Sequence, residues 1–252
     1  MIERNLVSRI TRGGFILLRH IDHKKMGQGN LGWLKTHFHF SFSSYYNPDN
    51  MQFGILRVLN DDIIQPHKGF ATHPHNDMEI ITYVINGSLA HKDSMGNEST
   101  IYRGESQYMS AGTGITHSEY NASDDELRLI QMWILPDKEG HTPNYGDQRF
   151  AWEERIDKWL PIATSYSNKE NAAPIKIHAD ANVYAIYLSA GNTTNFEVGA
   201  DRQAYLVLLE GDAKVESIEM TEKDALEIVG QNISITTEKG GHIYFIELPR
   251  TH

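Results

Sequence analysis

Two short segments of the sequence carry side chains that could bind one metal ion together. The first contains His73 and His75, and the second contains His117 and Glu119. Residues two apart on a strand point to the same face, so each pair can present both of its side chains to one point. Neutral imidazole is a good ligand for Fe, Cu, Ni and Zn. Three imidazoles and a carboxylate would leave coordination positions for water, O₂ or a substrate, as an open catalytic site requires.

The residues around the two pairs sharpen this hypothesis. Asp77 and Glu79 follow the first pair at the same spacing, so we expect them further along the same strand face. Gly112 and Gly114 precede the second pair, and glycine permits the positive φ angles of a sharp turn into a strand. A single His-x-His pair is more often part of a solvated strand face, so the metal hypothesis depends on both segments together.

The composition limits which chemistry such a site can use. The 252 residues include 13 histidines and no cysteine, which excludes disulfides, thiolate metal ligands, Fe–S clusters and a cysteine nucleophile. Any transition metal must therefore be held by nitrogen and oxygen ligands. Lys and Arg number 23 against 33 for Asp and Glu, and the net charge of −10 argues against a nucleic acid or an anionic membrane as partner.

The sequence also contains no recognisable membrane or export signal. No apolar stretch approaches the ~18–20 residues that a membrane helix needs. Residues 1–9 lack the apolar run of a signal peptide. We therefore expect a cytoplasmic protein that contacts neither a membrane nor a nucleic acid.

The elements that would position these side chains are strands. The segment 78–85 is rich in β-branched residues and is followed by Asn86-Gly87, and the segment 127–135 stops at Pro136. Turn signals recur every ~8–12 residues, which is the spacing of an antiparallel sandwich or barrel. We expect a short helix over 151–159. Further strands are predicted at 38–42, 183–188, 204–209, 233–237 and 242–248.

The strand pattern lapses over residues 136–171, where turn-forming residues predominate. With ~100–200 residues per domain as a guide, we predict an N-terminal metal-binding domain over residues 1–146 and a C-terminal domain over residues 147–252. A strand and glycine turn at 83–87 are weakly echoed at 206–211, as two tandem β-barrels would produce. The predicted fold class is therefore all-β, with two tandem jelly-roll-like barrels and few short helices.

Both histidine segments resemble the paired motifs of the cupin superfamily, and specifically those of the pirin family. The segment 69–80 reads Gly-Phe-Ala-Thr-His-Pro-His-Asn-Asp-Met-Glu-Ile, and the segment 110–119 reads Ser-Ala-Gly-Thr-Gly-Ile-Thr-His-Ser-Glu. The similarity extends from about residue 28 to residue 150. The C-terminal half is similar, only in pattern, to the second cupin domain of bacterial pirin-like quercetinases. Three further segments are also similar to the pirin family: 40–48, 56–62 and 87–96.

This resemblance implies a bicupin with one divalent transition metal, usually iron, in the N-terminal barrel. The family's ligands would correspond to His73, His75, His117 and Glu119. In most cupins the carboxylate ligand comes from the first motif, at the position of Glu79. Glu79 therefore either contacts the metal ligands without binding the metal, or is itself the carboxylate ligand. We expect Fe(II), and Zn, Ni, Cu and Mn are also compatible with these donors. The C-terminal barrel contains neither His-x-His nor His-x-Glu, and we expect it to be metal-free and to stabilise the first barrel.

The resemblance also suggests quercetin 2,3-dioxygenase chemistry, in which O₂ opens the heterocyclic ring of a flavonol and CO is released. Glu119 would be both a ligand and the catalytic base that takes the proton of the 3-hydroxyl group. Phe70 and Tyr120 are candidates to line an apolar slot for this flat aromatic substrate. The alternatives are a non-enzymatic, pirin-like, redox-sensing metal-binding regulator and a cupin that keeps its metal for stability alone. We expect a monomer, because a bicupin already pairs its barrels within one chain.

Several other polar residues are expected to have structural roles. His37 and His39 form a second His-x-His pair, but no further ligands follow them, and we expect a half-buried strand pair. His91 is expected to hydrogen-bond a predicted turn beside it. Asp61 and Asp62 are expected in a connecting turn. The histidines without a ligand partner nearby in the sequence are His178, His242 and His252.

Overall fold

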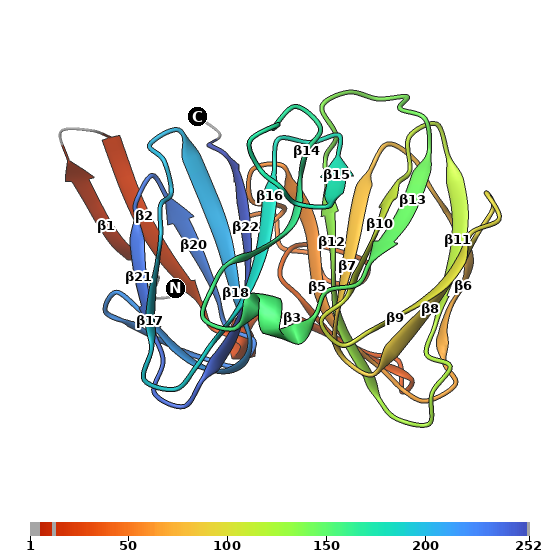
Figure 1. Cartoon of the computed structure of the whole chain (residues 1–252), viewed down its shortest axis with the longest axis horizontal. Coiled ribbons are helices and arrows are strands. Elements are labelled where there is room, and N and C mark those ends of the chain that lie inside the picture. Colours follow the sequence, from red (N-terminus) through yellow and green to blue (C-terminus); the bar gives the residue numbers. More distant parts are fainter. Residues whose placement is uncertain (1–5, 12–13, 251–252) are drawn as a thin grey trace. The chain divides into compact units, whose positions relative to one another are not determined.

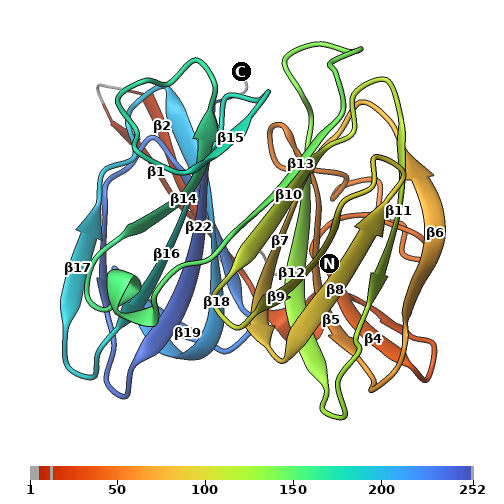
Figure 2. The same ribbon diagram turned by 45° about the vertical axis from the view of Figure 1, so that its right-hand side comes forward.

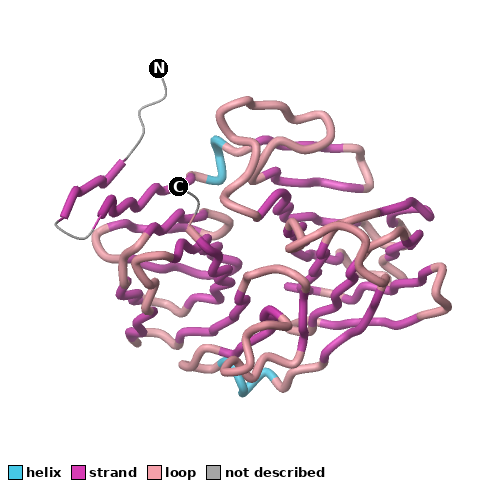
Figure 3. Tube along the Cα trace, turned by 90° about the horizontal axis from the view of Figure 1, so that it is seen from above, coloured by secondary structure: helices cyan, strands magenta, loops and turns pink. Residues whose placement is uncertain are grey.

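The computed structural model describes residues 6–11 and 14–250, and strands dominate this part of the chain (Figure 1). The helical segments among these residues are two short 3-10 turns, η1 (His23–Lys25) and η2 (Trp152–Arg155), as the tube coloured by secondary structure also shows (Figure 3). The all-β prediction is confirmed. The helix predicted over 151–159 is confirmed only within η2, because Asp157 adopts a φ of 55°, which a right-handed helix cannot continue. No described helical segment is long and apolar enough to cross a membrane.

Most of the predicted strands are present, but the one predicted over 38–42 is wrong. Strand β4 (Leu34–Phe38) ends where that strand was predicted to begin. Ser43 has a positive φ of 52°, and the Ser41 hydroxyl accepts a hydrogen bond from the Asn47 backbone N–H at 2.8 Å. The alternation of aromatic and polar residues in this segment therefore belongs to a turn and not to a strand.

The chain divides into two compact units, and each is built from separate stretches of the sequence. Unit 1 comprises Met1–Lys25, Trp152–Ala163 and Ala181–His252. Unit 2 comprises Met26–Ala151 and Thr164–Asp180. The chain thus passes between the units more than once, which a single boundary between residues 146 and 147 does not describe.

Unit 2 contains two antiparallel sheets (Figure 2). The larger sheet has seven strands in the order β13-β10-β7-β12-β5-β4-β3, and the smaller has four in the order β6-β11-β8-β9. The strands of the larger sheet, besides β4, are β3 (Gly27–Asn30), β5 (Leu56–Ile64), β7 (Glu79–Asn86), β10 (Ser106–Ser110), β12 (Leu127–Ile134) and β13 (Asn144–Gln148). The strands of the smaller sheet are β6 (Gly69–His75), β8 (Ser88–Asp93), β9 (Glu98–Tyr102) and β11 (Ile115–Tyr120). The short strand β15 (Ile175–Ile177) also lies in this unit.

Apolar side chains from both sheets of unit 2 share one core. Leu34, Ile64 and Leu129 come from the larger sheet, and Leu89 and Ile101 come from the smaller one. The inward-facing sides of the two sheets therefore face each other. Strand β11 alternates buried and more exposed residues. His117 and Glu119 are among the buried ones, so both side chains point to the interior of unit 2.

Unit 1 is built around a third antiparallel sheet. Strands β1 (Leu6–Thr11) and β2 (Gly14–Ile21) form a hairpin, and β2 pairs with β20 (Ala225–Val229), so the N-terminal residues complete a sheet of C-terminal strands. Its buried core includes Leu206, Leu226 and Phe245. The remaining strands are β14 (Leu160–Ser165), which spans the division between the units, β16 (Asn182–Leu188), β17 (Thr193–Phe196), β18 (Arg202–Val215), β19 (Ile218–Thr221), β21 (Ile233–Thr236) and β22 (Gly241–Pro249).

Candidate metal centre

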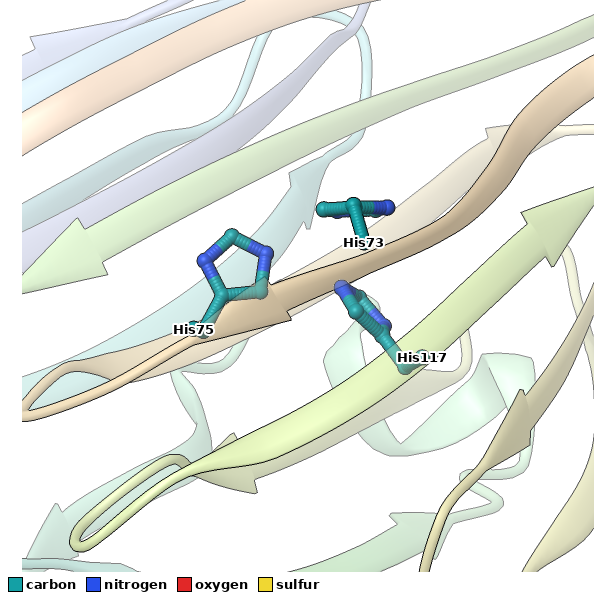
Figure 4. Close-up of side chains that lie close together, drawn as sticks. All are labelled: His73, His75 and His117. Carbon is teal, nitrogen blue, oxygen red and sulfur yellow. The ribbon is translucent and has the colours of Figure 1, made fainter.

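Three histidines from two neighbouring strands of unit 2 turn their imidazole rings toward a common point (Figure 4). His73 and His75 lie on β6, and His117 lies on β11 directly opposite His73 in the antiparallel register. A ligand atom from each of the three residues lies within 4.8 Å of the other two. The ring centroids are 4.5 Å apart for His73 and His117, and 4.9 Å apart for His75 and His117. This arrangement can hold one metal ion through three nitrogen atoms.

The hydrogen bonding of the triad fits a metal ligand set. His117 is 2% exposed, and neither of its ring nitrogens has a hydrogen-bond partner among the described residues. A buried, unpaired imidazole is costly, and a bound cation would satisfy it. The Nδ1 atom of His73 lies 2.8 Å from the Ala71 carbonyl oxygen, so it carries the proton and leaves Nε2 as the free lone pair.

The protonation states also favour metal binding. Burial, followed by the nearby His73 and His75, lowers the pKa of His117 from 6.5 to about 3. Burial and then His73 lower the pKa of His75 from 6.5 to about 4. Both rings are therefore neutral at pH 7, and neutral imidazole is the form that binds a metal.

Glu119 lies beside the triad on β11, after a shift in the strand register between His117 and Glu119. It is 2% exposed, and one of its carboxylate oxygens groups with a nitrogen of His117 and a nitrogen of His91 within 4.8 Å. The structure thus brings Glu119 to His117 together with His91. Burial raises the pKa of the Glu119 carboxyl group, and hydrogen bonds from side chains such as Gln131 oppose that rise.

Two glutamine amides hold the Glu119 carboxylate. Gln107 Nε2 donates to Oε1 at 2.7 Å, and Gln131 Nε2 donates to Oε2 at 2.8 Å. Trp133 Nε1 in turn donates to the Gln131 side-chain oxygen Oε1 at 3.2 Å, and the Tyr145 hydroxyl donates to the Gln107 side-chain oxygen Oε1 at 3.3 Å. Because an indole N–H can only donate, Trp133 fixes the Gln131 amide with its NH₂ group toward Glu119. The sequence analysis missed these four residues, since they come from three other strands.

Asp77 and Glu79 do not continue the strand face of the first histidine pair, so that expectation is wrong. Strand β6 ends at His75, and Asp77 has a positive φ of 46° and accepts a hydrogen bond from the Gly140 N–H at 2.7 Å. Glu79 begins β7 in the other sheet of unit 2. Its two oxygens accept hydrogen bonds from the Ser110 hydroxyl at 2.6 Å and the His178 N–H at 3.2 Å.

His91 lies at the turn, as expected, and also beside the site. Its Nε2 atom is 3.3 Å from Asp93, whose carboxylate accepts hydrogen bonds from backbone N–H groups of the turn, such as that of Asn97 at 3.0 Å. His91 is also the direct cross-strand neighbour of Glu119, and its ring centroid is 5.3 Å from that of His117. The alternation of inward and outward side chains along strand β8 (Ser88–Asp93) could have indicated that His91 points inward.

The remaining histidines are not part of the triad. Among the described residues, neither His37 nor His39 belongs to a group with metal-like spacing. His39 is 1% exposed, and burial, opposed by Asp61, lowers its pKa from 6.5 to about 4. His178 stacks on His141, the ring of His242 lies 2.9 Å from a Glu210 oxygen, and His252 lies outside the described residues.

A cavity of about 760 Å³ adjoins the candidate metal centre and is lined by residues of unit 2. His73, His75 and Glu119 line it together with the aromatic side chains of Trp33, Phe38, Phe42, Phe70 and Trp133. Phe70 thus lies where the sequence analysis placed it. Tyr120 does not line the cavity: it is 43% exposed, and its hydroxyl donates to the His67 carbonyl oxygen.

Asp61 and Asp62 lie in the middle of strand β5, and the expectation of a connecting turn is wrong. Asp61 is 1% exposed and forms an ion pair with Arg128 at 2.7 Å. Asp62 is 5% exposed and lines the cavity. Two adjacent acidic residues are tolerated in this central strand because one has an Arg partner and the other faces an open space.

The two facing antiparallel sheets of unit 2, with three imidazoles converging between them, are the architecture of a cupin. Residues 11–134 match the family described as Pirin, and residues 165–248 match the quercetinase C-terminal cupin domain. The chain belongs to the pirin family. The predicted resemblance and the predicted pair of cupin domains are thereby confirmed.

Relatives of known sequence or structure cover nearly the whole chain. A pirin-like protein of Caulobacter vibrioides is 41% identical over 231 residues, which cover 90% of this chain and 99% of the relative. A quercetin 2,3-dioxygenase of Escherichia coli K12 is 39% identical over 236 residues, which cover 93% of this chain and 99% of the relative. The crystal structure of the bacterial pirin YhhW from Escherichia coli in complex with nickel(II) is similar with a TM-score of 0.86 and 36% identity, over 93% of this chain and 100% of that chain.

Proposed function

We propose that this chain is a metal-dependent dioxygenase that opens the heterocyclic ring of quercetin-like flavonols with O₂ and releases CO. The observation that carries the proposal is the convergence of three imidazoles, one of them fully buried and without hydrogen-bond partners among the described residues, at the wall of a cavity. The relative from Escherichia coli K12 that is named quercetin 2,3-dioxygenase supports the choice of reaction.

The residues that would hold the metal are His73, His75, His117 and Glu119. Their nitrogen and oxygen donors suit Fe(II), which we expect, and also Ni, Zn, Cu or Mn. The nickel(II) complex of the related bacterial pirin supports a divalent transition metal as the bound ion. Such an ion would supply a Lewis acid for an ionised hydroxyl oxygen and, as Fe(II), the redox chemistry that O₂ requires.

Glu119 would accept the proton of the flavonol 3-hydroxyl group. Each carboxylate oxygen has two lone pairs, and the amide donors of Gln107 and Gln131 use one on each side. The Thr82 side chain uses a third lone pair, so the fourth is available to the metal ion or to the proton. Burial raises the pKa of Glu119, which strengthens the carboxylate as a base, and the two amides hold it in place for the transfer.

The cavity suits a flat aromatic substrate. Its volume of about 760 Å³ falls within the range of ~300–1,000 Å³ that is typical of small-molecule sites. Trp33 and Phe70 lie edge to face with ring centroids 5.3 Å apart, and His75 lies edge to face with Trp133 at 4.8 Å. These rings offer apolar surface next to the imidazole nitrogens, so a flavonol could be held against them with its 3-hydroxyl group near Glu119.

Turnover by Fe(II)-loaded protein tests this proposal. Quercetin and O₂ should be consumed together, CO should be released, and the flavonol absorbance should bleach. His73→Ala should abolish all three signals. His67→Ala is a matched control, because the exposed His67 ring contacts Asp124 at 2.9 Å and does not line the cavity. If the wild type binds metal stoichiometrically but turns over no flavonol, the dioxygenase is refuted and the regulatory alternative is favoured.

A further inference from the structure

Three polar side chains form a patch on the wall of the cavity, on the sheet opposite the one that carries the histidines. Thr36 on β4 and Asp62 on β5 are directly paired in the antiparallel register, and Asn60 lies two residues from Asp62 on the same face of β5. All three line the cavity. The histidines lie on β6 and β11 of the smaller sheet, so a ligand in the cavity can contact both walls.

One side-chain oxygen of each residue in this patch is buried without a partner among the described residues. Asn60 is 6% exposed and Asp62 is 5% exposed. In the part of the chain that the structure describes, neither Asn60 Oδ1 nor Asp62 Oδ1 has a hydrogen-bond partner. The cross-strand neighbour of Asp62 on β12 is the apolar Leu129, which offers no donor. Buried polar atoms are almost always hydrogen-bonded, so two unpartnered acceptors on one cavity wall indicate a ligand that donates to them.

The adjacent polar residues show that this lack of partners is local. Asp61 next to Asp62 is paired with Arg128, and Gln131 opposite Asn60 donates to Glu119 and to Thr82. The sheet therefore satisfies the polar groups that flank the patch. A molecule within the cavity can reach the side of Asn60 and Asp62 that lines it.

We propose that Asp62, together with Asn60, binds a phenolic hydroxyl group of the substrate and so selects polyhydroxylated rings over rings that lack this hydroxyl. The proposal rests on the proposed function for the identity of the ligand as a flavonol. In this proposal the hydroxyl group bound by Asp62 and Asn60 is a second one, distinct from the 3-hydroxyl group near Glu119. Asp62 acts as a specificity-determining residue that contacts the substrate.

The charge state of Asp62 suits a hydroxyl better than a cation. Burial raises the pKa of Asp62 from 3.8 to about 7, the nearby charges of Asp61 and Glu119 add to the rise, and the Thr36 side chain opposes it. Near neutral pH the carboxyl group can thus either accept a hydrogen bond or donate one, and a phenolic hydroxyl can do both. Sites built to hydrogen-bond a hydroxyl reject analogues that lack it, because their own buried polar groups are then left unpaired.

Ligand binding to the metal-loaded protein without O₂ tests the proposal separately from catalysis. Quercetin carries hydroxyl groups on both ring systems, and 3-hydroxyflavone carries only the group expected near Glu119. Quenching of the fluorescence of Trp33 and Trp133, which line the cavity, reports binding. The wild type should bind quercetin at least tenfold more tightly than 3-hydroxyflavone. Asp62→Leu should reduce this ratio to near one by weakening quercetin alone.

Two further variants show whether the effect belongs to the Asp62 carboxyl group. Asp62→Asn keeps an acceptor and a donor at the same position and should retain most of the preference. Asp124→Leu is the matched control, because the Asp124 side chain is 96% exposed and does not line the cavity; it should bind both ligands as the wild type does. A preference for quercetin that survives in Asp62→Leu, or an equal weakening of both ligands, would overturn the proposal.

Stability and metal content distinguish a binding role from a structural one. Replacing a buried, poorly paired carboxyl group with an apolar side chain should leave the melting temperature unchanged or higher, with the metal content unaltered. A large loss of stability in both Asp62→Leu and Asp62→Asn would show a structural role and refute the inference. Selective quercetin binding without O₂ consumption would uphold the inference and refute the dioxygenase, whereas turnover of both flavonols that is insensitive to Asp62 would do the reverse.

Discussion

The His73–His75–His117 triad in unit 2 and the Asp22–His23–Asp224 cluster in unit 1 have the same spacing, since the ligand atoms of each lie within 4.8 Å of one another. Their hydrogen bonding differs completely. Neither ring nitrogen of His117 has a partner among the described residues, whereas both oxygens of Asp224 are engaged. Distance alone therefore does not identify a metal site. Free lone pairs on the donor atoms are also required.

The Asp224 cluster has the hydrogen bonds of a structural clamp. Asp224 is 3% exposed, and its Oδ1 atom accepts from the His23 backbone N–H at 2.9 Å. Its Oδ2 atom accepts from the Thr221 N–H at 2.9 Å and lies 3.1 Å from the His20 ring. These contacts join the end of β2 to the turn between β19 and β20. A metal would have to displace several of them, which fits the proposal that the C-terminal cupin domain is metal-free.

The largest effect that we predict is the loss of metal from His117→Ala. Mutation of a residue that hydrogen-bonds a metal ligand typically lowers the metal affinity by about 10–100-fold. Removing one of the three convergent imidazoles should lower it by more than that. Metal analysis after dialysis against a weak chelator should find close to one ion per chain in the wild type and almost none in the variant. His37→Ala, in the other His-x-His pair, should keep its metal. Retention of a stoichiometric metal by His117→Ala would contradict the proposed ligand set.

Asp224→Ala should have the opposite pattern, with stability lost and metal retained. Removing one partner from a buried, hydrogen-bonded charge cluster typically costs about 3–5 kcal/mol. Urea denaturation should show this loss in the free energy of unfolding, while the metal content stays at the wild-type value. A variant that loses metal without losing stability would make the Asp224 cluster the metal site and reverse the comparison.

The same clamp has a defined pH dependence. Burial alone would raise the pKa of Asp224, but the hydrogen bonds from His20, His23 and Thr221 outweigh burial and lower the pKa below 3.8. The stabilisation is therefore fully present above the unfolded pKa and is lost as the pH falls through the folded pKa. Asp224→Ala should consequently lose less stability on acidification below about pH 4 than the wild type does.

A further prediction uses Asp62, a buried carboxyl group whose contact with the Thr36 side chain does not outweigh its burial. Its pKa of about 7 lies above the unfolded value of 3.8, so the folded state keeps a proton that the unfolded state releases. Stability should thus fall as the pH rises from about 4 to about 7, by roughly 3 kcal/mol, which is the opposite sign to Asp224. Chemical denaturation of metal-free protein at pH 5 and pH 8 measures this change. Asp62→Asn should remove it, and an identical pH dependence in wild type and variant would show that Asp62 is not the titrating group.

The sequence analysis could find the triad because its members follow from local rules. Residues two apart on a strand share a face, and a glycine turn delivers the second strand, so His73, His75 and His117 were accessible to spacing alone. Asp62 was not accessible in this way. Acidic pairs are common in turns, and the partner that holds Asp61 in a strand is Arg128, 67 residues later.

The domain organisation was limited by the same lack of long-range information. The N-terminal strand β2 pairs with β20, and Leu18 lies opposite Ile228. No local pattern assigns a strand to a partner some two hundred residues away. The prediction for Glu79 failed for a local reason. A continuous strand would have placed the carboxylates of Asp77 and Glu79 on the same face as the histidines, but the positive φ of Asp77 interrupts the strand.

The smallest effect that we predict comes from the hydrogen bond between Trp133 and Gln131, which acts on the candidate metal centre only through Glu119. Trp133→Phe keeps an aromatic ring against Phe42 and His75 but removes the N–H group that donates to Gln131. The Gln131 amide can then rotate and present its oxygen to Glu119, which repels the carboxylate. Metal affinity should fall by about tenfold, the lower limit for residues that orient ligands. Competition with a chelator of known affinity measures this change.

Unit 1 offers a matched control for that substitution. Trp159 Nε1 donates to the Asn195 carbonyl oxygen at 3.1 Å, so Trp159→Phe removes an equivalent indole hydrogen bond away from the candidate metal centre. Each variant should lose the modest stability of one hydrogen bond, about 1 kcal/mol, but only Trp133→Phe should bind metal more weakly. If both variants bind metal as the wild type does, Glu119 keeps its position without the indole. The orientation of the Gln131 amide would then come from its contact with Thr82 alone.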